Sequence, residues 1–165
     1  MLLAAVLCGN FLLLLLFPIM RSCDHAPHLP NLLLHLLLNA MQPVMKARKE
    51  FGVEYPNLYA TPGYHKEADA FNRVQRGHQA VLVESLPSFT ISALVAGVCY
   101  PITMSITGIA WSIGAYLFQL GYADKNLDVK MARYKKGGMI FRLANAVAFG
   151  ACVRMGGKLC GWWST

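Results

Sequence analysis

Two arginines and one acid at the start of an apolar stretch are the residues of this chain best suited to chemistry. Residues 71–87 read FNRVQRGHQAVLVESLP, and the apolar stretch continues to Tyr100. Arg76 and Glu84 lie eight residues apart, close to two helical turns, so one helix face carries both charges. Along the helix axis this spacing is about 12 Å, and a cation and an anion so placed suit the two ends of a small zwitterion.

Ionisable residues inside an apolar helix are costly unless they are paired, so they mark functional sites. Glu84 is a lone acid in its apolar stretch and requires a partner. Arg76, on the same face, is the best candidate both for that partner and for the grip on a ligand.

The composition is that of a membrane protein. Of the 165 residues 56% are hydrophobic and 14% are charged, whereas a soluble domain carries about 25% charged residues. Since a spanning helix needs about 20 apolar residues, there is room for four or five spans and for no separate soluble domain. We predict an all-α integral membrane protein, a four-helix transmembrane bundle with spans at residues 31–46, 71–100, 101–121 and 138–155.

The basic residues are distributed as topology signals. One group falls between the first two predicted spans and the other between the last two: Lys46, Arg48, Lys49, Lys66, Arg73 and Arg76, then Lys125, Lys130, Arg133, Lys135, Lys136 and Arg142. Two spans separate the groups, so both face one side, and an excess of Lys and Arg marks that side as cytoplasmic. The net charge of +7 therefore suits acidic membrane lipids, and we expect no nucleic-acid partner.

Residues 1–28 are predicted to form an N-terminal hydrophobic segment and connector ahead of the four-helix domain at 29–160. Residues 2–20 are apolar, with no basic residue ahead of the run and no clear cleavage site, so they do not match a secretory signal. They fit a signal anchor, an uncleaved extra helix or an artefact of gene prediction, and we favour the extra helix. The five cysteines form no C-x-x-C pair and no metal-ligand spacing, so we expect no metal site.

Three strings taken together resemble the MAPEG family, the membrane-associated proteins in eicosanoid and glutathione metabolism. They are KARKEFGVEYP at 46–56, FNRVQRGHQ at 71–79 followed by Glu84 and Pro87, and WSIG at 111–114 followed by GY at 121–122. The likeness covers roughly residues 30–155, and the branch that it resembles is microsomal glutathione S-transferase type three.

The resemblance implies a four-helix protomer that assembles as a homotrimer, with glutathione as co-substrate between neighbouring protomers near the cytosolic face. The implied reaction is conjugation of the glutathione thiolate to a lipophilic electrophile, or reduction of a lipid hydroperoxide. The implied location is the endoplasmic reticulum or nuclear envelope, with the outer mitochondrial membrane as the alternative.

The resemblance also implies roles for residues. Arg76 is similar to the helix-two arginine that holds glutathione, and Glu84 to the acid that receives its ammonium group. The chemistry agrees, because the planar fork of arginine binds carboxylates bidentately, and glutathione has two carboxylates.

Four further residues are implied as glutathione-binding. Arg48 resembles a first-helix arginine contributed by a neighbouring subunit, and Tyr122 a tyrosine that lines the site. Arg73 and His78 belong to the same matched signature as Arg76. A role purely as topology signals stays open for Arg48 and Arg73, as does a role purely as an interface anchor for Tyr122.

Catalysis on a thiol needs a cation near the sulfur, because the thiolate is the nucleophile and positive charge lowers the thiol pKa. In a related branch of the family an arginine at the start of the fourth-helix region has this role. Here the candidates are Lys130 and Arg133, and we lean to Arg133 because a guanidinium keeps its charge. A solvated basic loop is the alternative for both.

The chain departs from the family pattern at three places. It has one residue more between Arg76 and Glu84, which rotates the acid by about 100° unless the helix bulges. Ala80 stands where the family often has asparagine, and Phe118 where many members have tyrosine. These differences leave a second interpretation open, a catalytically silent MAPEG-type membrane protein that acts through protein or lipid partners.

Overall fold

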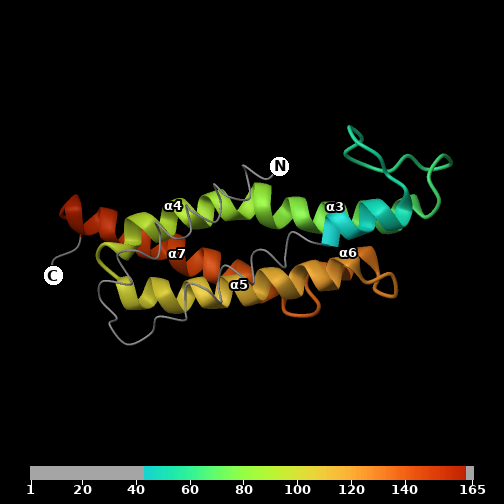
Figure 1. Ribbon diagram of the computed structural model, residues 1–165. Coiled ribbons are helices and arrows are strands. Elements are labelled where there is room, and N and C mark those ends of the chain that lie inside the picture. Colours follow the sequence, from blue (N-terminus) through green and yellow to red (C-terminus); the bar gives the residue numbers. More distant parts are fainter. Residues whose placement is uncertain (1–42, 163–165) are drawn as a thin grey trace, which may run out of the picture.

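Three apolar helical stretches lie side by side along the length of the protein (Figure 1). The computed structural model describes residues 43–162. Within them, the stretches that are long and apolar enough to cross a membrane are Ala68–Gly97, Pro101–Ala123 and Gly138–Leu159. The described part of the chain is thus an all-helical assembly with three candidate membrane spans.

These stretches confirm the last three predicted spans, at 71–100, 101–121 and 138–155, to within a few residues. The predicted N-terminal helix at 2–20 and most of the predicted span at 31–46 lie outside the described residues. The count of four spans therefore stays a prediction.

In chain order the elements are α3 (Ala68–Gln79), η1 (Ala80–Ser85), α4 (Leu86–Gly97), α5 (Pro101–Ala123), α6 (Val129–Ala132) and α7 (Gly138–Leu159). The first three form one continuous helix, in which η1 is a π-helical segment. Pro101 starts α5, where its missing N–H is no loss. α5 then runs back along the first helix, and α7 returns beside both (Figure 1).

Aromatic rings hold the three stretches together. The ring of Trp111 in α5 stacks on Phe89 of α4 at 5.0 Å and meets the edge of Phe141 of α7 at 6.3 Å. Two turns further along α5, Phe118 contacts Phe141 at 4.9 Å. Because each ring buries roughly 150–250 Å², these contacts fix how α4, α5 and α7 lie relative to one another.

Gly114 lets α5 and α7 approach closely, and a side chain there is expected to force them apart. A Cβ at this position would lie 2.4 Å from the backbone nitrogen of Phe141 and 2.9 Å from the Cβ of Ile140. We expect Gly114→Ala to cost about 1–3 kcal/mol, as overpacking does, and to lower the thermal midpoint in detergent. Gly108→Ala is the matched control, because a Cβ at Gly108 in the same helix meets nothing within 4 Å. Equal midpoints for the two variants would contradict this packing argument.

The two basic loops meet at one end of the protein, as predicted (Figure 1). Lys125, just after α5, forms an ion pair with Glu67, just before α3, and this pairing lowers the pKa of the Glu67 carboxyl. Lys136 donates to Asp124 at 2.6 Å and holds the pKa of that carboxyl below its usual range. Part of the basic charge is therefore neutralised within the loops themselves.

The segment between α5 and α7 differs from the prediction in two respects. It contains a single helical turn, α6, in which the Asp128 side chain accepts a hydrogen bond from the backbone N–H of Lys130 at 3.1 Å. The grouping of Arg142 with this loop is wrong, because α7 already begins at Gly138, and the grouping of Arg73 and Arg76 with the preceding loop is wrong likewise, because both lie in α3. Arg142 lies in the second turn of α7, within the apolar stretch.

Candidate functional site

Arg76 and Glu84 form an ion pair within the first described span, as predicted, and the pair depends on the π-helical segment between them. The Nη1 atom of Arg76 donates to Oε1 of Glu84. In a regular α-helix eight residues turn about 800°, so Glu84 would point about 80° away from Arg76. The wider turn of η1 absorbs the extra residue and brings the carboxylate back to the face of Arg76.

The local sequence favours a wide turn at this place. The backbone N–H of Leu86 bonds to the carbonyl of Val81, five residues earlier, as in a π-helix. Pro87 follows at once and has no N–H to donate back to the preceding turn. One regular hydrogen bond is therefore lost here in any helical form, which lowers the cost of the irregular turn.

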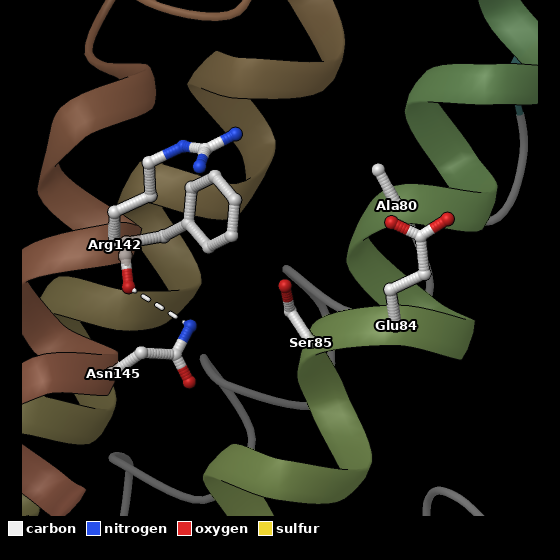
Figure 2. Close-up of a pocket in the computed structure, with 6 residues that line it drawn as sticks. Ala80, Glu84, Ser85, Arg142 and Asn145 are labelled. Atoms are coloured by element: carbon white, nitrogen blue, oxygen red, sulfur yellow. Dashed lines mark hydrogen bonds between the residues drawn. The ribbon is translucent and has the colours of Figure 1, made fainter.

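A polar cavity lies between this segment and α7. Its volume is about 330 Å³, and it is lined by Ala80, Glu84, Ser85, Phe141, Arg142 and Asn145. Ala80, Glu84 and Ser85 form one wall, and the three residues of α7 form the other (Figure 2). The side chains of Ser85 and Asn145 extend into the gap from opposite walls (Figure 2). The volume lies at the lower end of the range for ligand pockets, about 300–1,000 Å³.

Arg142 is a cavity residue that the sequence did not single out. Its guanidinium lies 5.7 Å from the ring centre of Phe141, 6.0 Å from that of Phe118 and 5.9 Å from that of Tyr134. Contacts of this kind attract a cation to the faces of aromatic rings and hold it in place. The sequence did contain a signal for Arg142. It lies within an apolar helical stretch, where an unpaired cation is costly and therefore marks a candidate site.

Arg73 has a structural position that the sequence did not predict. Its guanidinium donates to the backbone carbonyls of Tyr122 at 3.0 Å, Asp124 at 2.7 Å and Leu127 at 2.8 Å. These carbonyls lie at and beyond the C-terminal end of α5, where cations are favourable. Arg73 therefore ties α3 to the end of α5, and it is not among the residues that line the cavity.

Arg48 lies in a helical stretch at residues 43–51, and its side chain contacts the loop that follows this stretch. It donates to the carbonyls of Val53 at 3.3 Å and Asn57 at 2.9 Å, and its guanidinium lies 4.3 Å from the ring centre of Tyr55. These contacts order the loop 52–67. Its predicted contact with glutathione in a neighbouring subunit stays a prediction.

Tyr122 and His78 lie near Arg76 but outside the cavity lining. Tyr122 is buried and packs against Gly77, where a Cβ would lie 3.1 Å from the Cβ of Tyr122. Its ring centre is 5.4 Å from that of Phe118. Gly77 thus allows α3 and α5 to approach beside the ion pair, while His78 is half-buried in the next position.

Lys130 and Arg133 are exposed in the loop segment, one within α6 and one just after it. Neither lines the cavity, whose cation is Arg142. The predicted role of Lys130 or Arg133 at the thiol therefore rests on the family resemblance alone.

Of the three departures from the family pattern, one lies in the cavity wall and a second lies beside a residue of that wall. Ala80 contributes a methyl group to its wall, where an asparagine would add an amide. Phe118 is 1% exposed and lies below Arg142, so no hydroxyl is offered there. The third departure, the extra residue, is accommodated by η1.

A family model described as the MAPEG family matches residues 29–154. The match covers most of the chain, including the whole of α3, η1, α4, α5 and α6 and most of α7. The strings at 46–56, 71–79 and 111–122 that carry the resemblance all fall inside it. A match of this extent shows that the chain belongs to the MAPEG family.

Proposed function

We propose that this chain is a membrane glutathione transferase of the microsomal type-three kind. It conjugates the glutathione thiolate to lipophilic electrophiles or reduces lipid hydroperoxides. The observation that carries the proposal is the Arg76–Glu84 ion pair inside a membrane span. The π-helical turn compensates for the inserted residue, so the pair is retained where a regular helix would separate it.

The pair supplies complementary groups for the co-substrate. Oε1 of Glu84 accepts from Arg76, and its other carboxylate oxygen is available for an ammonium group. Arg76 has five N–H donors, so one hydrogen bond to Glu84 leaves donors for a ligand carboxylate. Both side chains are about half exposed, at 44% and 50%, so a ligand can reach them.

In the proposed conjugation the glutathione sulfur forms a bond to carbon, the leaving group departs with the bonding electrons, and the thiol proton goes to solvent. In the peroxidase reaction two glutathione molecules are oxidised to the disulfide while the hydroperoxide is reduced to an alcohol and water. A cation near sulfur favours both reactions because the thiolate is the nucleophile. Lys130 and Arg133 are the proposed sources of that charge, and no metal is involved.

The proposed assembly is a homotrimer in the endoplasmic reticulum or nuclear envelope, with the outer mitochondrial membrane as the alternative location. Arg48 would reach the glutathione of a neighbouring protomer, with Arg73, His78 and Tyr122 supporting the site. The apolar spans support entry of a lipophilic substrate from the bilayer.

A second candidate function is a catalytically silent family member that acts through protein or lipid partners. Three observations favour it: the methyl group of Ala80 in the cavity, the missing hydroxyl at Phe118, and the fact that neither Lys130 nor Arg133 is among the residues that line the cavity.

One experiment separates the two functions. Purified wild-type protein in detergent is titrated with glutathione by calorimetry and is then assayed with an activated aromatic halide and with a lipid hydroperoxide. The transferase proposal predicts saturable binding together with conjugation or peroxide reduction above the uncatalysed rate. Absence of glutathione binding ends the enzyme proposal and leaves the silent member.

A further inference from the structure

Arg142 is a cation in the membrane span Gly138–Leu159, and it has no carboxylate partner among residues 43–162. The ion pairs of that part of the chain are Arg76–Glu84, Lys125–Glu67 and Lys136–Asp124. The predicted span at 31–46 contains no acidic residue, so it supplies no carboxylate either. Because an ionised side chain in an apolar helix is costly without a counter-charge, we expect an anion from outside the chain at this exposed residue.

The depth of Arg142 in its span matches the level of the lipid headgroups. α7 has 22 residues and is therefore about 33 Å long, close to the thickness of a bilayer's hydrocarbon core, about 30 Å. Arg142 follows the first residue of α7, Gly138, by about 6 Å along the helix axis. An arginine side chain so close to the end of a span reaches the headgroup layer.

Aromatic rings hold the guanidinium in place. Its carbon Cζ lies 5.7 Å from the ring centre of Phe141 and 6.0 Å from that of Phe118, and both rings are almost fully buried. The third ring, that of Tyr134, lies 5.9 Å away in the loop before α7 and is 48% exposed. The guanidinium is therefore backed by the core and borders an exposed tyrosine, whose hydroxyl is a further donor. Such preorganisation lowers the cost of binding.

The loop around Tyr134 adds positive charge. Lys130, Arg133 and Lys135 are exposed, and none of them takes part in an ion pair of the described residues. The carboxylate of Asp128 offsets part of this charge, and it accepts a hydrogen bond from the backbone N–H of Lys130. Cations still exceed acids here, so this surface favours an anion over a zwitterion.

The acid that lines the same cavity has its own cation. Glu84 lies on the opposite wall (Figure 2), and its charge is compensated by Arg76. On the wall of Arg142, Asn145 donates to the backbone carbonyl of Phe141 at 3.2 Å and keeps a second amide N–H. The cavity wall on α7 therefore offers donors to an anion.

An apolar stripe continues along α7 from Arg142 toward the other end of the span. Phe149 and Val153 follow Arg142 by seven and eleven residues, so the three lie within about 20° of one another on one helix face. Their side chains are 65% and 45% exposed. A cation at the headgroup level above an exposed apolar stripe matches the two parts of a phospholipid.

We propose that Arg142 binds the phosphate of an anionic phospholipid, with the headgroup at the mouth of the cavity between η1 and α7 and an acyl chain along Phe149 and Val153. The phosphate oxygens fit the planar donor fork of the guanidinium. Phosphatidylcholine is disfavoured, because its choline cation would meet the cations of the loop. The inference does not depend on the proposed function, since it applies to a transferase and to a silent family member alike.

Native mass spectrometry of the full-length protein in detergent tests the lipid site, because each bound lipid appears as a separate mass. Phosphatidic acid and phosphatidylcholine with identical acyl chains are titrated into the wild type, Arg142→Met, Lys135→Met and Arg154→Met. Arg154→Met is the matched control, because Arg154 is exposed on α7 about 18 Å further along the helix axis. Inorganic phosphate and glycerol 3-phosphate are then added in excess as competitors that lack acyl chains.

We expect the wild type to bind its first phosphatidic acid about 10-fold more tightly than phosphatidylcholine. Arg142→Met should weaken the binding of phosphatidic acid by about 10- to 100-fold, the scale of hydrogen bonds to a charged group. Lys135→Met should weaken it by about fivefold, the effect of one cation near an anionic headgroup. Arg154→Met should bind both lipids as the wild type does, and neither soluble phosphate should displace the lipid.

Three results would overturn the lipid site. They are equal affinities of the wild type for the two lipids, equal losses in Arg142→Met and Arg154→Met, and displacement of the lipid by a soluble phosphate, which would assign the site to a free anion. The thermal midpoint of each lipid-free variant identifies a folding defect. If Arg142→Met does not fold, Lys135→Met decides, and an unchanged affinity of that variant for phosphatidic acid would equally overturn the site.

Discussion

Replacing Arg76 with alanine is expected to abolish saturable glutathione binding, a loss of about 100-fold or more. The substitution removes the cation proposed to hold a glutathione carboxylate, and it also deprives Glu84 of its partner in the described chain. Removal of one member of a hydrogen-bonded charge pair typically costs 2–5 kcal/mol in binding, partly because the other charge is left unpaired. Calorimetry in detergent gives the constant, and the conjugation assay should lose its glutathione dependence in parallel.

Two control variants separate recognition from folding. Arg76→Lys keeps the charge but loses the planar fork, so we expect weakened yet measurable binding. The double variant Arg76→Ala with Glu84→Gln removes both charges, and its thermal midpoint should return toward that of the wild type while binding stays absent. Full glutathione affinity in Arg76→Ala would remove this residue from the site.

Deletion of Val83 is expected to leave both the stability of the protein and its glutathione binding nearly unchanged. Val83 lies inside η1, and its side chain is 63% exposed. Without it seven positions separate Arg76 and Glu84, which turn about 700° and so come within about 20° of two full turns of α-helix. We expect the π-helical turn to close into an α-helix with the ion pair kept. The change in unfolding free energy and in glutathione binding should stay within about 0.5 kcal/mol, as for a tolerated surface change.

Deletion of Ile113 is the matched control, because it removes an exposed residue from the regular helix α5. There is no extra residue to absorb the loss, so every position after it rotates by about 100°. Phe118 and Tyr122 would leave the core, and losing one buried Phe already costs about 3–5 kcal/mol. We expect this variant to aggregate or to unfold at a much lower temperature. Equal damage from the two deletions would show that the wide turn is not the device that accommodates the insertion.

The sequence predicted the spans well because their signal is local. Apolar residues over about 20 positions are enough to identify a spanning helix, and Pro101 and Gly138 lie at the starts of α5 and α7. The ion pair was also predictable, since both members belong to one helix and the acid needed a partner. The spacing between them posed a choice between a rotated acid and a bulged helix, and the helix bulges.

Residues that act across helices were harder to predict. Arg73 belongs to the same signature as Arg76, yet it donates to three carbonyls at the end of α5, about 50 positions later. The sequence treated Arg142 only as one of several basic residues that set the topology. The residues next to it in the chain do not reveal that Glu84, on another helix, lines the same cavity.

The sequence by itself determined that this protein is a helical membrane protein of the MAPEG family with a cation and an anion in its first described span. Local hydrophobicity and a short motif suffice for both conclusions. Only the tertiary structure decided that the inserted residue forms a π-helical turn, that Arg73 caps α5, and that Arg142 faces Glu84 across a cavity. Those outcomes depend on how α4, α5 and α7 pack through Trp111 and its neighbouring rings, and packing between distant segments leaves no periodic trace in the sequence.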